Sequence, residues 1–284
     1  TCSNTSEIRS SNPCSEYFFI DNSACNLASI NLQKVLDDNG EINLEKYTHV
    51  IRTLILAQEI LVDASSYPTE LIAKNSHDYR PLGLGYANLG TILMLKGLAY
   101  DSDEARDLAG AVTAKLSGEA YLMSSEIAAK MGAFNGFKKN REPMLRVIDK
   151  HLTQAKLIDK SSHFQQITKS ARKAWEQALA NGKKAGLRNS QISVLAPTGT
   201  IGLLMDCDTT GVEPEFALVK YKKLAGGGYF KIVNQSVSKA LVKLGYTESE
   251  IEDIVKYSKG HGTLAGCPDI NKVSLIDKGF TEDK

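Results

Sequence analysis

Apolar residues recur at helical spacing in several long stretches of the chain. Within residues 43–64 they fall three or four positions apart, which places them on one face of a helix. The residues of this face are Tyr47, Val50, Ile51, Leu54, Ile55, Ala57 and Leu61. The same reasoning predicts further helices over about 102–131, 141–152, 161–181, 229–244 and 247–259.

Several boundaries of these helices carry their own signals. Asp101-x-x-Glu104 and Thr247-x-x-Glu250 resemble capping boxes, in which two side chains satisfy the free N–H groups of a first turn. Gly132 and Asn181-Gly182 are natural stops, because glycine and asparagine accept the left-handed backbone that ends many helices.

Shorter apolar stretches predict strands. Tyr17–Ile20 is aromatic and β-branched, and Gln191–Ala196 alternates between apolar and polar residues. The glycine-dotted stretch at 82–86 indicates close backbone packing rather than a dinucleotide-binding turn, and we expect it to continue as a helix to Gly97. Short strands among long helices favour an α/β fold, taken as one partial domain over residues 1–284.

Composition excludes several classes of protein. The 284 residues are 42% hydrophobic, and 34 Lys and Arg against 33 Asp and Glu give a net charge of +1. This balance gives no indication of a nucleic acid partner, and no apolar run reaches the length of a membrane span. Five cysteines in a chain of this length do not suggest a secreted disulfide framework, so we expect a cytoplasmic protein.

The most distinctive chemistry lies at Asn12-Pro13-Cys14-Ser15-Glu16, which holds an amide, a thiol and a carboxyl two residues apart. In extended backbone such residues point the same way, so one substrate would meet all three groups. The alternative is that Cys14 is a buried hydrophobic residue, as free cysteines often are. The polar neighbours favour an exposed reactive thiol, and these residues alone leave both interpretations open.

Three other features are candidates for chemistry. Cys25 is a second thiol, whereas nothing activates Cys2, and Cys267 is given no role. The predicted strand 191–196 leads into the turn 197–200 and an apolar run, where free N–H groups and hydroxyls suit a phosphate.

A metal site at Asp206, Asp208 and Glu213 is conceivable, but a solvated or capping loop is favoured. The basic cluster Lys169, Arg172, Lys173, Lys183 and Lys184 is interpreted as a solvated face.

Taken in order, these blocks resemble the active-site segments of ribonucleotide reductase catalytic chains. The resemblance rests on residues 11–17, 24–32 and 196–202. The eleven-residue spacing of Cys14 and Cys25, together with residues 206–214 and 220–228, is similar to the adenosylcobalamin-dependent class.

The resemblance implies a ten-stranded α/β barrel with an internal radical-bearing loop and many surrounding helices, of which this chain supplies a C-terminal part. It implies that Cys14 becomes a thiyl radical, that Glu16 is a general base toward the 3′-hydroxyl, and that Asn12 holds a ribose hydroxyl. Cys25 and a cysteine upstream would supply two electrons. A Cys14–Cys25 disulfide is disfavoured because it would consume the radical thiol. The substrate-binding residues implied are Asn12, Pro13, Cys14, Ser15, Glu16, Pro197, Thr198, Gly199, Thr200 and Ile201.

The implied reaction is reduction of ribonucleoside diphosphates to 2′-deoxyribonucleoside diphosphates, with adenosylcobalamin as cofactor and no metal site. The implied partners are the ribonucleotide, a thioredoxin-like or glutaredoxin-like reductant, nucleotide effectors acting through an N-terminal part that is not here, and a second subunit of a homodimer. We expect this chain to be a fragment that is inactive alone. The alternatives are a non-catalytic paralogue that binds nucleotide phosphate, and a thiol redox or zinc protein, which the absence of paired C-x-x-C spacing disfavours.

Overall fold

The computed structural model describes residues 1–223 and 226–281. It divides the chain into two compact units, Thr1–Glu215 and Phe216–Lys284. The expectation of a single partial domain stays a prediction. Leu224 and Ala225, in the middle of one block of the resemblance, lie outside the described residues, as do Glu282 to Lys284.

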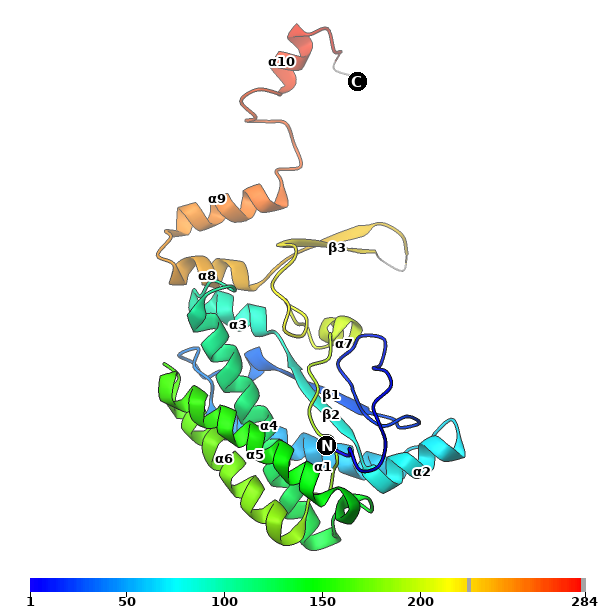
Figure 1. The fold of residues 1–284 in the computed structure, drawn as a ribbon. Coiled ribbons are helices and arrows are strands. Elements are labelled where there is room, and N and C mark those ends of the chain that lie inside the picture. The colour runs from blue at the N-terminus through cyan, green and yellow to red at the C-terminus, as the bar shows by residue number, and fades with distance from the viewer. Residues whose placement is uncertain (224–225, 282–284) are drawn as a thin grey trace. The chain divides into compact units, whose positions relative to one another are not determined.

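The first unit contains most of the helices and one small parallel sheet (Figure 1). In chain order its elements are β1 (Asn26–Asn31), the 3-10 helix η1 (Leu32–Val35), α1 (Leu44–Ala64), α2 (Glu70–Tyr79), β2 (Leu82–Ala87), α3 (Leu89–Lys96), α4 (Asp103–Met131), α5 (Phe137–Ser161), α6 (Gln165–Ala185) and α7 (Gly199–Leu204).

Within its described residues, the second unit is a hairpin followed by three helices. Its elements are β3 (Val219–Lys223), β4 (Tyr229–Val233), α8 (Ser236–Lys243), α9 (Glu248–Lys259) and α10 (Lys272–Asp277). The hairpin is antiparallel, with Lys223 opposite Tyr229. The predicted capping box of α9 is confirmed, because Thr247 and Glu250 satisfy each other's backbone N–H groups.

The parallel sheet forms the frame of the first unit. Strands β1 and β2 pair from Asn26 opposite Leu82 to Asn31 opposite Ala87. The predicted strand at 191–196 lies along the other edge of β2, where Leu82 N–H donates to Gln191 O at 2.8 Å, but it forms only an isolated bridge. Helices and strands are mixed as expected. The described residues hold two two-stranded sheets and no closed barrel.

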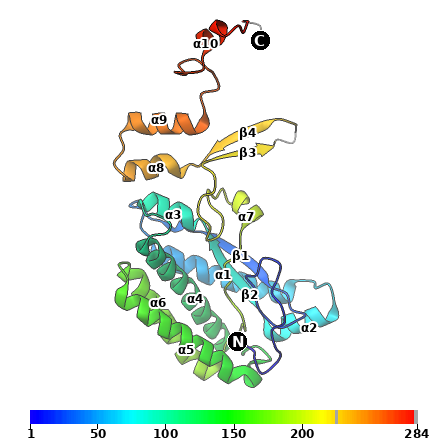
Figure 2. The ribbon, with the colours of Figure 1, turned by 45° about the horizontal axis from the view of Figure 1, so that its top comes forward.

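The helices α4, α5 and α6 pack side by side, and α4 also packs against α1 (Figures 1 and 2). Trp175 of α6 is fully buried against α4, where its Nε1 donates to Ala114 O at 3.0 Å. A Cβ on Gly118 would lie 2.8 Å from the Trp175 ring. Glycine at this position therefore lets the largest side chain of the core approach the α4 backbone.

Several strand predictions were wrong. Tyr17–Ile20 belongs to no strand, although Phe19 and Ile20 are buried as its apolar character suggested. Residues 82–87 form strand β2, where a helix was expected, and the predicted helix continues only from Leu89. Residues 229–233 form β4 rather than the first turns of a helix.

Helix boundaries also differ from the predictions. The N-cap of α4 is Ser102, whose side chain accepts the Ala105 N–H, rather than Asp101. Helix α5 begins before residue 141 and runs past 152. Helix α6 continues through Gly182 and is capped by Gly186.

No helix within the described part of the chain is long and apolar enough to cross a membrane.

Candidate active site

Cys14 lies in a closed turn. The Ser15 N–H donates to Asn12 O at 3.0 Å, and the Asn12 N–H donates to Tyr17 O at 3.2 Å. The Asn12 side chain adds a third bond, because its Oδ1 accepts the Tyr17 N–H at 3.0 Å. Ser15 has a φ of 64°, in the left-handed region, so the chain reverses here. The expectation of extended backbone was therefore wrong, and the alternation of side chains argued from it does not hold.

The turn presents its thiol to solvent. Cys14 is exposed together with Pro13 and Ser15, whereas Asn12 and Glu16 are half-buried. Cys14 is therefore not a core residue, and the alternative of a buried hydrophobe is wrong. Because the Asn12 Oδ1 already accepts the Tyr17 N–H, its Nδ2 is the atom left to donate to a ligand.

Glu16 directs part of its carboxyl group inward. Its Oε2 is buried and has no hydrogen-bond partner among the described residues. A buried carboxylate oxygen without a donor is costly, so such an atom commonly marks a place where a donor is supplied from outside the chain. A substrate hydroxyl is a donor of the right kind.

Cys25 immediately precedes β1 and is half-buried. Burial, and to a lesser extent the negative charge of Glu16, raises the pKa of its thiol from about 9 to about 12. The charge of Glu16 therefore acts on the Cys25 sulfur. At neutral pH the Cys25 thiol keeps its proton.

The predicted phosphate turn leads into α7. Thr198 is buried at the start of this helix with a φ of 57°, and its Oγ1 accepts the Gly211 N–H at 2.6 Å. The hydroxyl of Thr198 therefore faces the 206–214 loop and is not the free group that was expected. The other members of the turn are exposed: Pro197, Gly199, Thr200 and Ile201. No side chain caps the first N–H groups of α7.

The sheet relates these segments to one another. Cys25 lies at the amino end of β1, and the C-terminal end of α7 is held at the carboxyl end, where Asn31 Nδ2 donates to Met205 O at 3.1 Å. In both views the dark blue N-terminal loop adjoins α7 (Figures 1 and 2). A spacing of one sugar between Cys14 and the turn stays a prediction.

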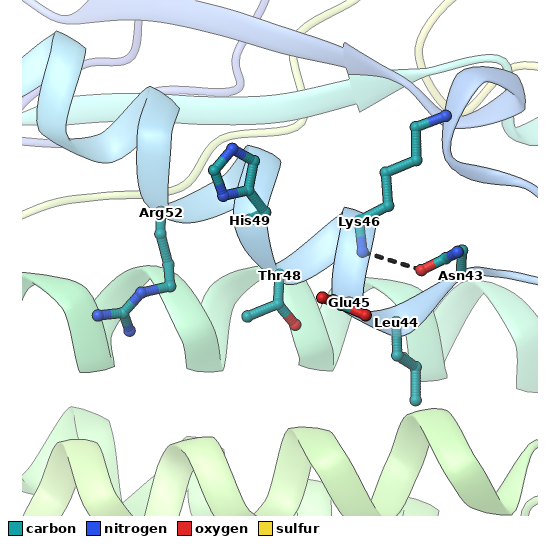
Figure 3. A pocket seen from close by; sticks show the side chains of 7 residues that line it. All are labelled: Asn43, Leu44, Glu45, Lys46, Thr48, His49 and Arg52. Carbon is teal, nitrogen blue, oxygen red and sulfur yellow. Dashed lines mark hydrogen bonds between the residues drawn. The ribbon is translucent and has the colours of Figure 1, made fainter.

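Two hollows in the surface of the first unit are candidates for a ligand site. One of about 400 Å³ lies beside the turn and is lined by Ser10 to Asn12, Tyr17 and Phe19 to Ser23. Another of about 690 Å³ lies along the first turns of α1 and is lined by residues between Asn43 and Arg52 (Figure 3). Asn43 there accepts the Lys46 N–H, and Arg52 pairs with Glu119 at 2.9 Å. Since Asn43 and Arg52 are thus engaged within the fold, we assign this second hollow no part in the chemistry.

The acidic loop gives no indication of a metal. Thr210 donates to Glu213 at 3.0 Å. No group of three or more potential metal-ligating side chains was found within residues 1–223 and 226–281.

Two residues at the site were missed by the sequence analysis. Tyr17 was interpreted only as part of a strand, yet its hydroxyl lies 3.0 Å from Ser23 Oγ, and burial and the charge of Cys25 raise its pKa. Gly83 faces the sulfur of Cys25. The alternate glycines Gly83 and Gly85 in an apolar stretch were the available signal for a close approach.

Comparison with known proteins identifies the family to which the chain belongs. Residues 1–276 match the family described as ribonucleotide reductase, barrel domain. The chain belongs to this family.

The individual relatives are much longer than this chain. It is 52% identical over 275 residues to a protein of Rhodopirellula baltica named vitamin B12-dependent ribonucleotide reductase, covering 97% of this chain and 26% of the relative. It is 49% identical over 293 residues to a protein of that name from Agrobacterium fabrum, covering 98% and 23%. It is 29% identical over 262 residues to the ribonucleoside-diphosphate reductase subunit alpha of Chlamydia muridarum, covering 90% and 24%. The chain thus spans about a quarter of the length of these relatives.

Proposed function

We propose that this chain carries the radical thiol of a ribonucleotide reductase that converts ribonucleoside diphosphates to 2′-deoxyribonucleoside diphosphates. The observation that carries the proposal is the exposed Cys14 in a closed turn, between the amide nitrogen of Asn12 and a buried oxygen of Glu16 that has no hydrogen-bond partner among the described residues. Membership of the family supports the reaction, and the name of the Chlamydia muridarum relative supports the diphosphate.

Each group of the turn has one task in this reaction. Cys14, as a thiyl radical, removes the 3′-hydrogen of the ribose. Glu16 accepts the proton of the 3′-hydroxyl, and Asn12 Nδ2 donates to a ribose hydroxyl. The 2′-hydroxyl leaves as water.

Cys25 supplies the reducing equivalents together with a second cysteine outside this chain. The two thiols lose two electrons and two protons, and they close as a disulfide. A hydrogen replaces the 2′-hydroxyl, so one ribonucleotide and two thiols give one deoxyribonucleotide, one water and one disulfide. The raised pKa of Cys25 supports this role, because it keeps the hydrogen on the sulfur at neutral pH. The disulfide is then reduced by a thioredoxin-like or glutaredoxin-like protein.

The turn from Pro197 to Ile201 anchors the substrate phosphates. Its support is the uncapped start of α7, where exposed backbone N–H groups of residues 199–201 suit anionic oxygens. Pro13 and Ser15 flank the thiol and complete the contact with substrate. Thr198 contributes through its backbone, since its side chain is bound to Gly211.

Adenosylcobalamin is the cofactor that the names of the relatives indicate. The residues present fit such a group at Cys14, because this cysteine is exposed and accessible to a group bound beside it. Cys14 is therefore the residue that would face the cofactor, which supplies the radical initiation when bound. We further propose nucleotide effectors and a homodimer for the complete protein, whereas the 284-residue chain alone is inactive.

Replacing Cys14 with Ala in the full-length protein tests the proposal. We expect formation of deoxyribonucleoside diphosphate to fall below detection while nucleotide binding persists. The matched control is Cys267→Ala, which removes a thiol from the second unit and should leave turnover unchanged. Retained turnover in the Cys14 variant would refute the central assignment. Turnover with the triphosphate but not the diphosphate would refute the substrate.

A further inference from the structure

Gly83 is a glycine whose backbone does not require glycine. It is buried, second in strand β2, and its φ lies outside the positive range that other residues avoid. Glycine inside a strand costs conformational entropy and offers no side chain to pack, so it commonly marks a close approach by another group.

The approaching group at Gly83 is a sulfur atom. A Cβ at this position would lie 2.5 Å from Cys25 Sγ, 2.7 Å from Leu27 Cδ2 and 2.8 Å from Val194 Cγ2. These distances are well inside the roughly 3.5–4.0 Å of favourable contact. The sulfur therefore occupies a notch at Gly83, which Leu27 of β1 and Val194 beside β2 also line.

The neighbouring glycine of the strand has a different purpose. A Cβ on Gly85 would lie 2.2 Å from the carbonyl oxygen of Val194, which is backbone and cannot rotate away. Gly85 thus keeps the 191–196 segment close to β2. At Gly83 only side chains meet the added carbon, and the nearest atom is the sulfur.

The geometry points to Gly83 as a positioning residue that seats the Cys25 thiol in this notch and so fixes where the reducing sulfur stands. The inference rests on the proposed function, because a fixed position of the Cys25 sulfur matters to the reaction only if Cys25 is a reductant. A methyl group at position 83 fills the notch and forces the sulfur to rotate out of it. The thiol then loses its burial and its fixed distance to the substrate.

Alkylation of Cys25 tests the seat directly. The full-length protein is treated with iodoacetamide, and modification of each cysteine within residues 1–284 is followed by mass spectrometry from pH 7 to 10. In the parent chain Cys25 reacts slowly, because burial raises the pKa of its thiol to about 12. Gly83→Ala should raise the Cys25 rate several-fold and move its pH profile to lower pH. A Cys25 rate and profile equal to those of the parent chain would overturn the inference.

Two controls separate displacement of the sulfur from loss of fold. Cys2 is 4% exposed and serves as an internal standard, so its rate should not change in the Gly83 variant. A parallel rise at Cys2 and Cys25 would indicate general unfolding and would also count against the inference. Gly110→Ala adds a carbon whose nearest neighbour is 3.7 Å away, and it should leave every rate unchanged.

A double-mutant cycle provides the second test. Gly83→Ala should lower the thermal midpoint less in a Cys25→Ala background, because the sulfur, which is the atom nearest to the added methyl group, is then absent. Equal decreases in both backgrounds would contradict the seat. In the full-length protein Gly83→Ala should lower kcat for repeated turnover while KM stays unchanged. If Cys25→Ala itself keeps full turnover, the proposed reductant role fails, while alkylation and the cycle still decide the seat.

Discussion

Single side chains at the turn serve structure and chemistry at once. Asn12 uses its Oδ1 to hold the Tyr17 N–H, and this bond leaves Nδ2 for a ligand. The amide is therefore suited to this position in a way that a hydroxyl or a carboxylate is not, because it is an acceptor on one atom and a donor on the other. Loop geometry and substrate contact can be separated by choosing which atom a substitution removes.

Asn12→Asp keeps the acceptor for the Tyr17 N–H and removes the donor. We expect kcat/KM to fall about tenfold, the equivalent of one ordinary hydrogen bond, with little change in thermal midpoint. Asn12→Ala removes both groups, so it should lower activity and also the midpoint. Steady-state kinetics of the full-length protein and thermal unfolding measure the two effects. Parent activity in the Asp variant would show that Nδ2 does not contact the substrate.

At the scale of elements, the phosphate turn is held by the loop that follows it. Thr198 accepts the buried Gly211 N–H, and a Cβ on Gly211 would lie 2.9 Å from the Ala196 carbonyl oxygen. Gly211 also has a φ of 47°, which favours glycine. The loop at 206–214 therefore packs against the base of the turn and fixes the direction of its N–H groups.

Thr198→Val tests this support, because it keeps the shape of the side chain and removes the acceptor. An unsatisfied Gly211 N–H should cost about 1–3 kcal/mol of unfolding free energy. We also expect KM for the ribonucleotide to rise, since the N–H groups of residues 199–201 are no longer held.

Two control variants accompany this test. Thr198→Ser should restore both values, and Thr200→Val, at an exposed position, should leave stability unchanged. Denaturant unfolding and steady-state kinetics supply the measurements. A Val variant with parent stability would show that the bond to Gly211 does not hold the turn.

The sequence predicted long helices well and buried strands poorly, for a physical reason. The predicted helix 43–64 agrees with α1 within a residue, because one face of this helix meets the core and the other meets water. Strand β2 is buried on both faces, so it shows no alternation that would separate it from a helix. Gly182 was predicted to end a helix, but it lies buried inside α6, where a Cβ would be 3.3 Å from Leu145.

The candidate site was predicted from residue types and their order, whereas its geometry was not. The structure shows that Cys14 is exposed, which its polar neighbours favoured, and it adds an influence of Glu16 on the pKa of Cys25 that was not predicted. The reversal at Ser15 and the inward hydroxyl of Thr198 depend on hydrogen bonds between residues three to thirteen positions apart. Such bonds leave no periodic signal in a sequence.

At the scale of the whole first unit, one buried carboxylate joins the segments that carry the site. Glu59 of α1 accepts from Arg80 Nε at 2.6 Å, from Arg188 Nε at 2.7 Å and from Asn189 Nδ2 at 2.6 Å. Arg80 caps α2 immediately before β2, and residues 188–189 precede the segment that leads to the phosphate turn. This cluster therefore ties the start of β2 and the approach to the turn to a single point on α1.

Among the described residues, Glu59→Ala leaves the buried guanidinium of Arg80 with only Asp63 as a carboxylate partner, and it removes the carboxylate that Arg188 contacts. Breaking a buried ion pair on one side costs about 3–5 kcal/mol, so we expect a loss of that size in urea unfolding. Glu59→Gln should cost less, because it keeps an acceptor. The control Glu142→Ala removes an exposed carboxylate and should change stability by less than about 0.5 kcal/mol. If the Glu59 and Glu142 variants unfold alike, the cluster does not hold the start of β2 and the approach to the turn in place.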